Sequence, residues 1–141
     1  MYSEVRARAR EYQDDVVRFL RDIIAIPSTS THEMDVVHRI AEEMRRFGLQ
    51  DVHFAPNGCV LGRVGHGPIT ILYDAHIDTV GVGDPKAWEF DPFVGKLENG
   101  VVYGRGASDN KAAMATMLHG ARILKEMDLD GAFTLWVAGV V

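Results

Sequence analysis

The chain has 141 residues, 47% of them hydrophobic and 25% charged, a composition typical of one soluble globular domain. Its formal net charge of −5 argues against nucleic acid or an anionic membrane as a partner, because both attract basic surfaces. The single cysteine, Cys59, excludes an intrachain disulfide. No apolar run reaches the roughly 20 residues of a membrane span, and residues 1–10 lack the apolar core of a signal peptide. We therefore expect a cytoplasmic protein.

Two amphipathic helices are predicted first. A helix is predicted over residues 4–24, with apolar residues recurring at helical spacing from Val16 to Ile24, and Ser3 can cap its start. A second helix is expected over residues 31–47. Ser30 and Glu33 form the S-x-x-E pattern of a capping box ahead of its apolar stripe.

After the second helix, the sequence pattern changes to short β-prone runs separated by turn-forming residues. These runs are residues 52–54, 59–64, 69–75, 93–98 and 101–103. Asn99-Gly100 predicts a tight hairpin between the last two runs. A third helix at 112–127, a turn at 128–131 and an apolar strand at 132–141 complete the chain. The alternation predicts an α/β three-layer sandwich with a mixed, mainly parallel sheet flanked by helices.

The sequence ends inside its last apolar run, residues 132–141. Domains rarely end within a buried strand, and functional residues of open α/β sheets follow the carboxyl ends of strands. We therefore expect residues 1–141 to be the N-terminal portion of a longer domain, with a fold incomplete at the C-terminus. We also expect an unpaired sheet edge beside this last strand.

Two residues that can take part in a metal site follow the run 69–75. His76 and Asp78 are two positions apart, so an extended backbone directs both side chains to the same face. Imidazole is the commonest metal ligand, and a neighbouring carboxylate can fix its tautomer, ligate, or orient a catalytic group. The pair alone is a weak signal, because a histidine at a strand end is more often a structural residue.

A second candidate segment precedes the third helix. Gly104 and Gly106 allow a tight loop that places Asp109 just before the helix, where Ser108 or Asp109 would also serve as an ordinary cap. A phosphate-binding loop is another alternative. The G-x-G-x-x-D order, however, puts a carboxylate where a dinucleotide motif has its third glycine, and that carboxylate would repel phosphate. The segment suits a cation better.

Together these segments resemble a known family. Tyr73–Val80, Trp88–Phe93 and Gly104–Lys111 are similar, in order and spacing, to the zinc-dependent aminoacylase and carboxypeptidase G-type peptidases. That family includes acetylornithine deacetylase and succinyl-diaminopimelate desuccinylase. Residues 65–68 and 76–81 resemble its branch of selenium-metabolism-linked hydrolases.

The resemblance implies a role for each candidate residue. His76 would ligate one zinc ion, Asp109 would bridge two, and Asp78 would orient His76 or the catalytic carboxylate. The peptide bond between Asp109 and Asn110 would be cis. The implied enzyme is a metal-dependent hydrolase of amide bonds that attacks small peptides or N-acyl amino acids with a dizinc-activated water. Cobalt or manganese could replace zinc, since both tolerate His and carboxylate ligands.

The resemblance also places the rest of the site beyond residue 141. The general-base glutamate, the remaining ligands, and the lid and dimerisation domain of the homodimeric relatives have no counterpart here. Residues 1–141 would therefore be the N-terminal portion of the metallohydrolase catalytic domain, inactive alone. The other histidines are expected to be structural or exposed: His32, His38, His53, His66 and His119. The alternative is a catalytically dead α/β binding or pairing module, which a genuine stop codon after Val141 would favour.

Overall fold

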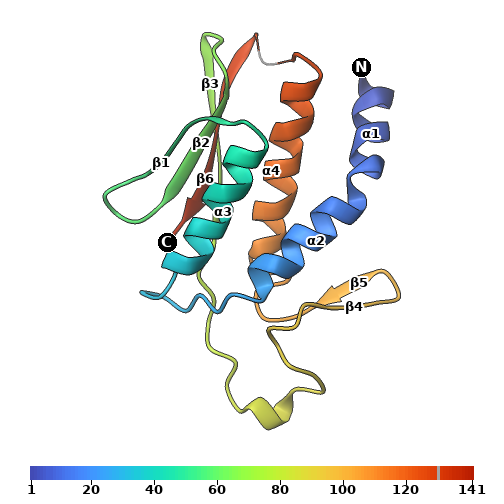
Figure 1. The fold of residues 1–141 in the computed structure, drawn as a ribbon, viewed down its shortest axis with the longest axis vertical. Coiled ribbons are helices and arrows are strands. Elements are labelled where there is room, and N and C mark those ends of the chain that lie inside the picture. The colour runs from blue at the N-terminus through green and yellow to red at the C-terminus, as the bar shows by residue number, and fades with distance from the viewer. Residues whose placement is uncertain (130) are drawn as a thin grey trace.

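The computed structural model describes residues 1–129 and 131–141. The helices are α1 (Tyr2–Glu11), α2 (Gln13–Ile24), α3 (Met34–Arg46) and α4 (Lys111–Glu126), with a short 3-10 helix η1 (Pro85–Ala87). The strands are β1 (Gln50–Phe54), β2 (Val60–Gly65), β3 (Ile69–His76), β4 (Lys96–Glu98), β5 (Val101–Tyr103) and β6 (Phe133–Val140). The predicted α/β class is confirmed (Figure 1). Along the described ranges, no helix is long and apolar enough to cross a membrane.

The main sheet has the strand order β1-β2-β6-β3. Strands β3 and β6 pair in parallel, whereas β1 pairs with β2, and β2 with β6, in antiparallel fashion. The predicted mixed sheet is confirmed, but its parallel share is smaller than expected because β1 and β2 form a local hairpin. Strand β6 is paired on both sides, so the predicted unpaired edge beside it is wrong. The two outer strands are β1 and β3, and Leu72 and Tyr73 of β3 are about half exposed.

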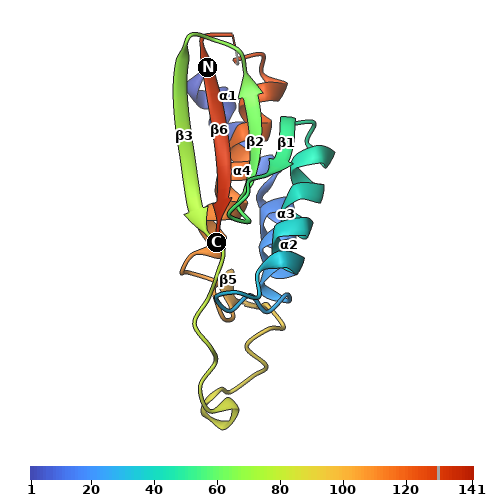
Figure 2. The ribbon, with the colours of Figure 1, turned by 90° about the vertical axis from the view of Figure 1, so that its left-hand side faces the viewer.

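The four helices lie on one face of this sheet, and the opposite face is open (Figure 2). The described residues therefore form two of the three expected layers. The hydrophobic core lies between the helices and the sheet. Its fully buried members include Phe19, Ile23, Ile40, Met114, Leu118 and Val137. Burial of the apolar faces of α2, α3 and α4 holds the layers together.

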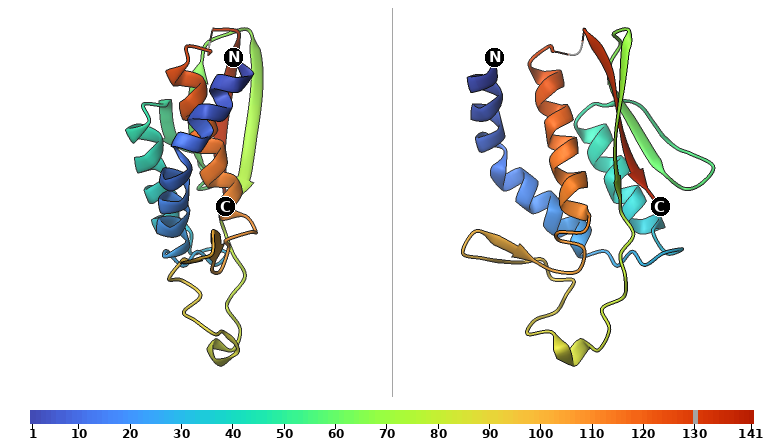
Figure 3. Two further views of the ribbon diagram at one scale, coloured as in Figure 1. Left: turned by 90° about the vertical axis from the view of Figure 1, so that its right-hand side faces the viewer. Right: turned by 180° about the vertical axis from the view of Figure 1, so that it is seen from behind.

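The predicted helix over residues 4–24 is divided in two at Tyr12. The Tyr12 hydroxyl donates to Glu126, and the Arg122 guanidinium lies 3.8 Å from the centre of the Tyr12 ring. These contacts hold Tyr12 against α4 at the bend between α1 and α2, which the views in Figure 3 show. The predicted Ser3 cap is also wrong, since α1 starts from Met1 without a side-chain cap.

The predicted capping box before α3 does not form. Helix α3 begins at Met34, later than expected, and Glu33 in the cap position makes no capping bond. Instead, Glu33 accepts a hydrogen bond from the backbone N–H of Thr31 at 2.6 Å. The Ser30 hydroxyl bonds to a residue distant in sequence, described below.

The predicted hairpin at Asn99-Gly100 is confirmed. Both residues have positive φ, 51° and 78°, as a two-residue hairpin turn requires. Strand β4 is shorter than the predicted run 93–98. The predicted turn at 128–131 includes Asp130, which lies outside the described residues.

Candidate metal centre

Two segments distant in sequence meet at the carboxyl ends of the parallel pair of strands. His76 is the last residue of β3 and is in register with Val140 of β6. The Ile77 amide donates to the Val140 carbonyl oxygen at 2.9 Å, so the chain stays beside β6 as it leaves the sheet. Opposite His76, the loop before α4 ends in Asp109. The peptide bond after Asp109 is cis, as the resemblance implied.

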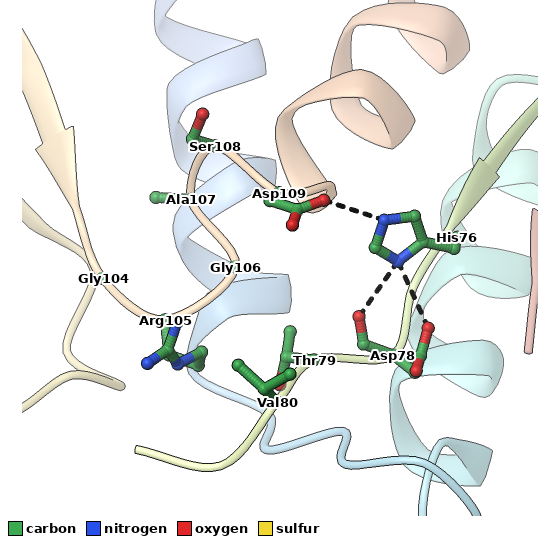
Figure 4. Close-up of a pocket in the computed structure, with 10 residues that line it drawn as sticks. All are labelled: His76, Asp78, Thr79, Val80, Gly104, Arg105, Gly106, Ala107, Ser108 and Asp109. Carbon is green, nitrogen blue, oxygen red and sulfur yellow. Dashed lines mark hydrogen bonds and ion pairs between the residues drawn. The ribbon is translucent and has the colours of Figure 1, made fainter. Parts of the chain in front are cut away.

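A hollow of about 230 Å³ lies between these segments (Figure 4). Its lining residues come from the end of β3 and from the glycine-containing loop. They are His76, Asp78, Thr79, Val80, Gly104, Arg105, Gly106, Ala107, Ser108 and Asp109. The structure thus brings together all three residues singled out from the sequence.

The imidazole of His76 lies between two carboxylates (Figure 4). Its Nε2 is 2.9 Å from Oδ1 of Asp109, and its Nδ1 is 3.2 Å from both Oδ1 and the backbone oxygen of Asp78. Asp78 offers only acceptors to Nδ1, which favours a proton on that nitrogen, and Nε2 is the nitrogen that faces Asp109. Asp78 thereby fixes which nitrogen is available toward the hollow.

The electrostatics of the site reflect this placement. Burial alone would lower the pKa of His76, but the hydrogen bonds to Asp109 and Asp78 outweigh it and raise the pKa overall. With two carboxylates so close, the ring attracts a positive charge at Nε2. That charge is either a proton or a metal ion.

The donor atoms suit part of a metal site. Two ligands of a tetrahedral zinc ion lie about 3.3 Å apart, because the bonds are about 2.0–2.2 Å long. The observed 2.9 Å between His76 Nε2 and Asp109 Oδ1 is close to this, so a small side-chain movement would admit an ion. The Asp109 side chain is 87% exposed, which leaves its second oxygen open. Within residues 1–129 and 131–141, no group of three or more His, Cys, Asp or Glu side chains is placed to hold one ion.

Sequence reasoning missed one residue that supports the loop. Lys111 is fully buried at the start of α4, and its Nζ donates to the carbonyl oxygens of Ile23 and Ile26 at 2.7 and 2.8 Å. Burial lowers the pKa of Lys111 to about 8. These bonds tie the first turn of α4, which follows Asp109 directly, to the end of α2. No local pattern distinguishes such a lysine from one that faces solvent.

The other five histidines lie outside the hollow, as expected. His119 is buried on α4, where its Nδ1 donates to the Ala115 carbonyl oxygen at 2.8 Å and its ring packs against Phe47. The remaining four are exposed: His32, His38, His53 and His66.

The chain is similar to known proteins over a range that includes these residues. Residues 72–141, which include His76, Asp78 and Asp109, match the model of the peptidase family M20/M25/M40. The protein named "Uncharacterized protein YgeY" of Escherichia coli K12 is 48% identical over 134 residues, which cover 95% of this chain and 33% of that protein. Succinyl-diaminopimelate desuccinylase of Bordetella avium is 34% identical over 106 residues, or 73% of this chain and 28% of the enzyme. The chain thus spans about a third of these relatives.

Solved structures share the fold at low sequence identity. Human carnosine dipeptidase 1 and the dipeptidase Dug1p of Saccharomyces cerevisiae each have a TM-score of 0.85, at 21% and 20% identity. Both alignments cover 98% of this chain and 34% of the other chain. The M20 family metallo-carboxypeptidase Sso-CP2 of Sulfolobus solfataricus has a TM-score of 0.78 at 20% identity, covering 89% of this chain and 30% of its own.

Proposed function

Because the chain belongs to the peptidase family M20/M25/M40, we propose that it forms part of the metal centre of a hydrolase that cleaves amide bonds in small peptides or N-acyl amino acids. The observation that carries the proposal is the His76 ring held between Asp78 and Asp109. A desuccinylase among the relatives and dipeptidases among the structural neighbours support this substrate class.

Each residue has a distinct part in the proposed site. His76 and Asp109 would hold the metal, and the exposed Asp109 carboxylate would leave an oxygen available to a second ion. Asp78 keeps the proton on Nδ1 of His76 and so directs the Nε2 lone pair outward. A bound divalent metal would supply a Lewis acid that polarises the amide carbonyl and lowers the pKa of water.

The rest of the proposed site belongs to the portion of the relatives that this chain does not span. A catalytic zinc ion needs about three protein ligands and a general base nearby, and this chain contributes two candidate ligands. Val140 is in register with His76, so residues following β6 in a protein of the relatives' length would start beside the metal position. We propose that these residues supply the general-base glutamate and that the chain alone is inactive.

Two further parts of the proposal rest on the resemblance alone: zinc is the proposed metal, and full-length proteins of this kind are proposed to form homodimers. The cytoplasm is the proposed location, on the sequence grounds given above.

Zinc titration by calorimetry tests the ligand assignment. The chain should bind zinc weakly, and both His76→Ala and Asp109→Ala should abolish that binding. The matched control is His66→Ala, which removes an exposed histidine from a turn outside the hollow. Tight two-site binding that survives both ligand substitutions would disprove the assignment.

Hydrolysis tests the activity. The zinc-loaded chain should release no amine from N-succinyl amino acids, N-acetyl amino acids or dipeptides. A chimera in which this chain replaces the matched third of the Escherichia coli relative restores the full length. It should turn over one of these classes, and His76→Ala should abolish turnover. An inactive but folded and zinc-binding chimera would favour the binding-module alternative.

A further inference from the structure

The segment after α2 lies against residues 77–79. The Thr79 amide donates to the Ser28 carbonyl oxygen at 2.7 Å, and the Ser28 hydroxyl donates to the Ile77 carbonyl oxygen at 2.8 Å. Thr29 and Thr79 form an isolated parallel bridge. Ser28 is fully buried, so water does not compete for these bonds. The backbone at residues 77–79 is therefore fixed by a segment that lies far away in sequence.

The same segment also reaches the side chain of Asp78. The Ser30 hydroxyl donates to Oδ2 of Asp78 at 2.8 Å, while Oδ1 of Asp78 accepts from His76 Nδ1 at 3.2 Å. Each carboxylate oxygen thus has its own partner. A rotation of the carboxylate would therefore disturb its bonds to Ser30 and His76 together.

A tight turn determines where Ser30 lies. Thr31 has a φ of 74°, which is rare for a β-branched residue. Two hydrogen bonds stabilise this turn: the His32 amide donates to the Thr29 carbonyl oxygen at 2.8 Å, and the Thr31 amide donates to the Glu33 carboxylate at 2.6 Å. Helix α3 has no side-chain cap, so the Ser30 hydroxyl has no competing role at the helix start.

We propose that Ser30 is a positioning residue of the metal centre, whose hydroxyl holds Asp78 so that Asp78 keeps His76 Nε2 directed at the metal position. This inference rests on the proposed function. Groups that orient a ligating histidine change metal affinity about 10–100-fold. Ser30 acts through one further hydrogen bond, so its loss should weaken zinc binding less, about three- to tenfold.

Three variants separate the hydroxyl from the fold. Ser30→Ala removes the donor, Ser30→Thr retains it at an exposed position, and Ser3→Ala removes an exposed serine on α1 as the matched control. Calorimetric titration should show weaker zinc binding for Ser30→Ala, and binding at the unsubstituted level for Ser30→Thr and Ser3→Ala.

A second measurement does not need metal. The ring nitrogens of His76 in the metal-free chain can be observed by ¹⁵N NMR, with His76→Ala to assign them. Ser30→Ala should shift these resonances, because the Asp78 carboxylate that accepts from Nδ1 is then free to turn. Ser30→Thr and Ser3→Ala should leave them in place, and thermal unfolding of all variants should agree within a few degrees.

The two measurements distinguish the possible failures. If the unsubstituted chain binds no zinc but Ser30→Ala still shifts the His76 ring signals, the metal centre is disproved while the positioning by Ser30 stands. If zinc binding depends on His76 and Ser30→Ala changes neither affinity nor ring signals, Ser30 has no positioning role. Equal losses of zinc affinity in Ser30→Ala and Ser30→Thr would show that a change in the fold, and not the loss of the hydroxyl, weakens binding.

Discussion

Gly106 offers a quantitative test of how tightly the site loop is packed. Its φ is +81°, and an added Cβ would lie 2.8 Å from Cγ2 of Thr79 and 3.2 Å from Cδ of Lys111. Both neighbours are buried, and Thr79 is held at its backbone by Ser28. Gly106→Ala therefore combines an unfavourable backbone conformation with a steric clash that neither neighbour can easily relieve.

Two other glycines separate these effects. Gly83 has a φ of +69° and no atom within 4 Å of an added Cβ. Gly83→Ala therefore tests only the cost of the positive φ for a residue with a Cβ, about 1–2 kcal/mol. Gly120, in helix α4, has neither a positive φ nor a close neighbour, so Gly120→Ala should stabilise the fold by about 0.5–1 kcal/mol. Overpacking adds about 1–3 kcal/mol, so Gly106→Ala should cost about 2–5 kcal/mol in total.

Urea denaturation of the three variants provides the assay, with the unfolding free energy obtained by linear extrapolation. From the most to the least stable, the expected order is Gly120→Ala, the unsubstituted chain, Gly83→Ala and Gly106→Ala. If Gly106→Ala is no less stable than Gly83→Ala, the loop does not pack against Thr79 and Lys111 as described. A destabilising Gly120→Ala would instead show that the face of α4 at Gly120 is covered in solution.

Two further predictions concern pH and buried charge. Burial raises the pKa of Glu43, but Arg46 and Arg39 outweigh it, and the net pKa lies below the ordinary value of 4.5. The ionised carboxylate therefore stabilises the fold above pH 4.5, and this stability is lost as pH falls through the lower pKa of the folded state. Glu43→Gln should cost about 1–3 kcal/mol of unfolding free energy at neutral pH. It should also make the urea midpoint depend less on pH in the acid range. The pKa of Lys111 falls from 10.5 to about 8, so the unfolded chain binds the extra proton between these values and stability should rise with pH there. Lys111→Met should remove this rise, and identical pH profiles for both proteins would refute it.

The sequence predicted the local parts of the site well, because their geometry follows from spacing. His76 and Asp78 share a face by strand periodicity, and the structure places them 3.2 Å apart. The approach of Asp109 to His76 could be expected only from the resemblance, since no spacing rule joins residues 33 positions apart. Whether these three residues bind metal stays a prediction.

The failures have a common physical cause, which is competition between local and distant partners. Ser30 fits a capping box by its local pattern, yet its hydroxyl bonds to Asp78, 48 positions away. The helix at residues 4–24 reads as continuous, yet contacts of Tyr12 with α4 divide it. Likewise, β2 pairs with β6 across some seventy residues, and this non-local antiparallel pairing, together with the local β1–β2 hairpin, makes the sheet more antiparallel than predicted.

The alternation of burial along residues 75–79 explains why an exposed site can still be rigid. Ala75, Ile77 and Thr79 are buried, while the side chains of His76 and Asp78 are 45% and 32% exposed. The buried residues lie in the core or bond to Ser28, so the backbone between them has little freedom. The exposed residues then need only side-chain contacts to be oriented, and Ser30 and Asp109 provide these from either side. Core packing thus sets the position of the candidate ligands, whereas hydrogen bonds set their direction, and the two can be perturbed separately.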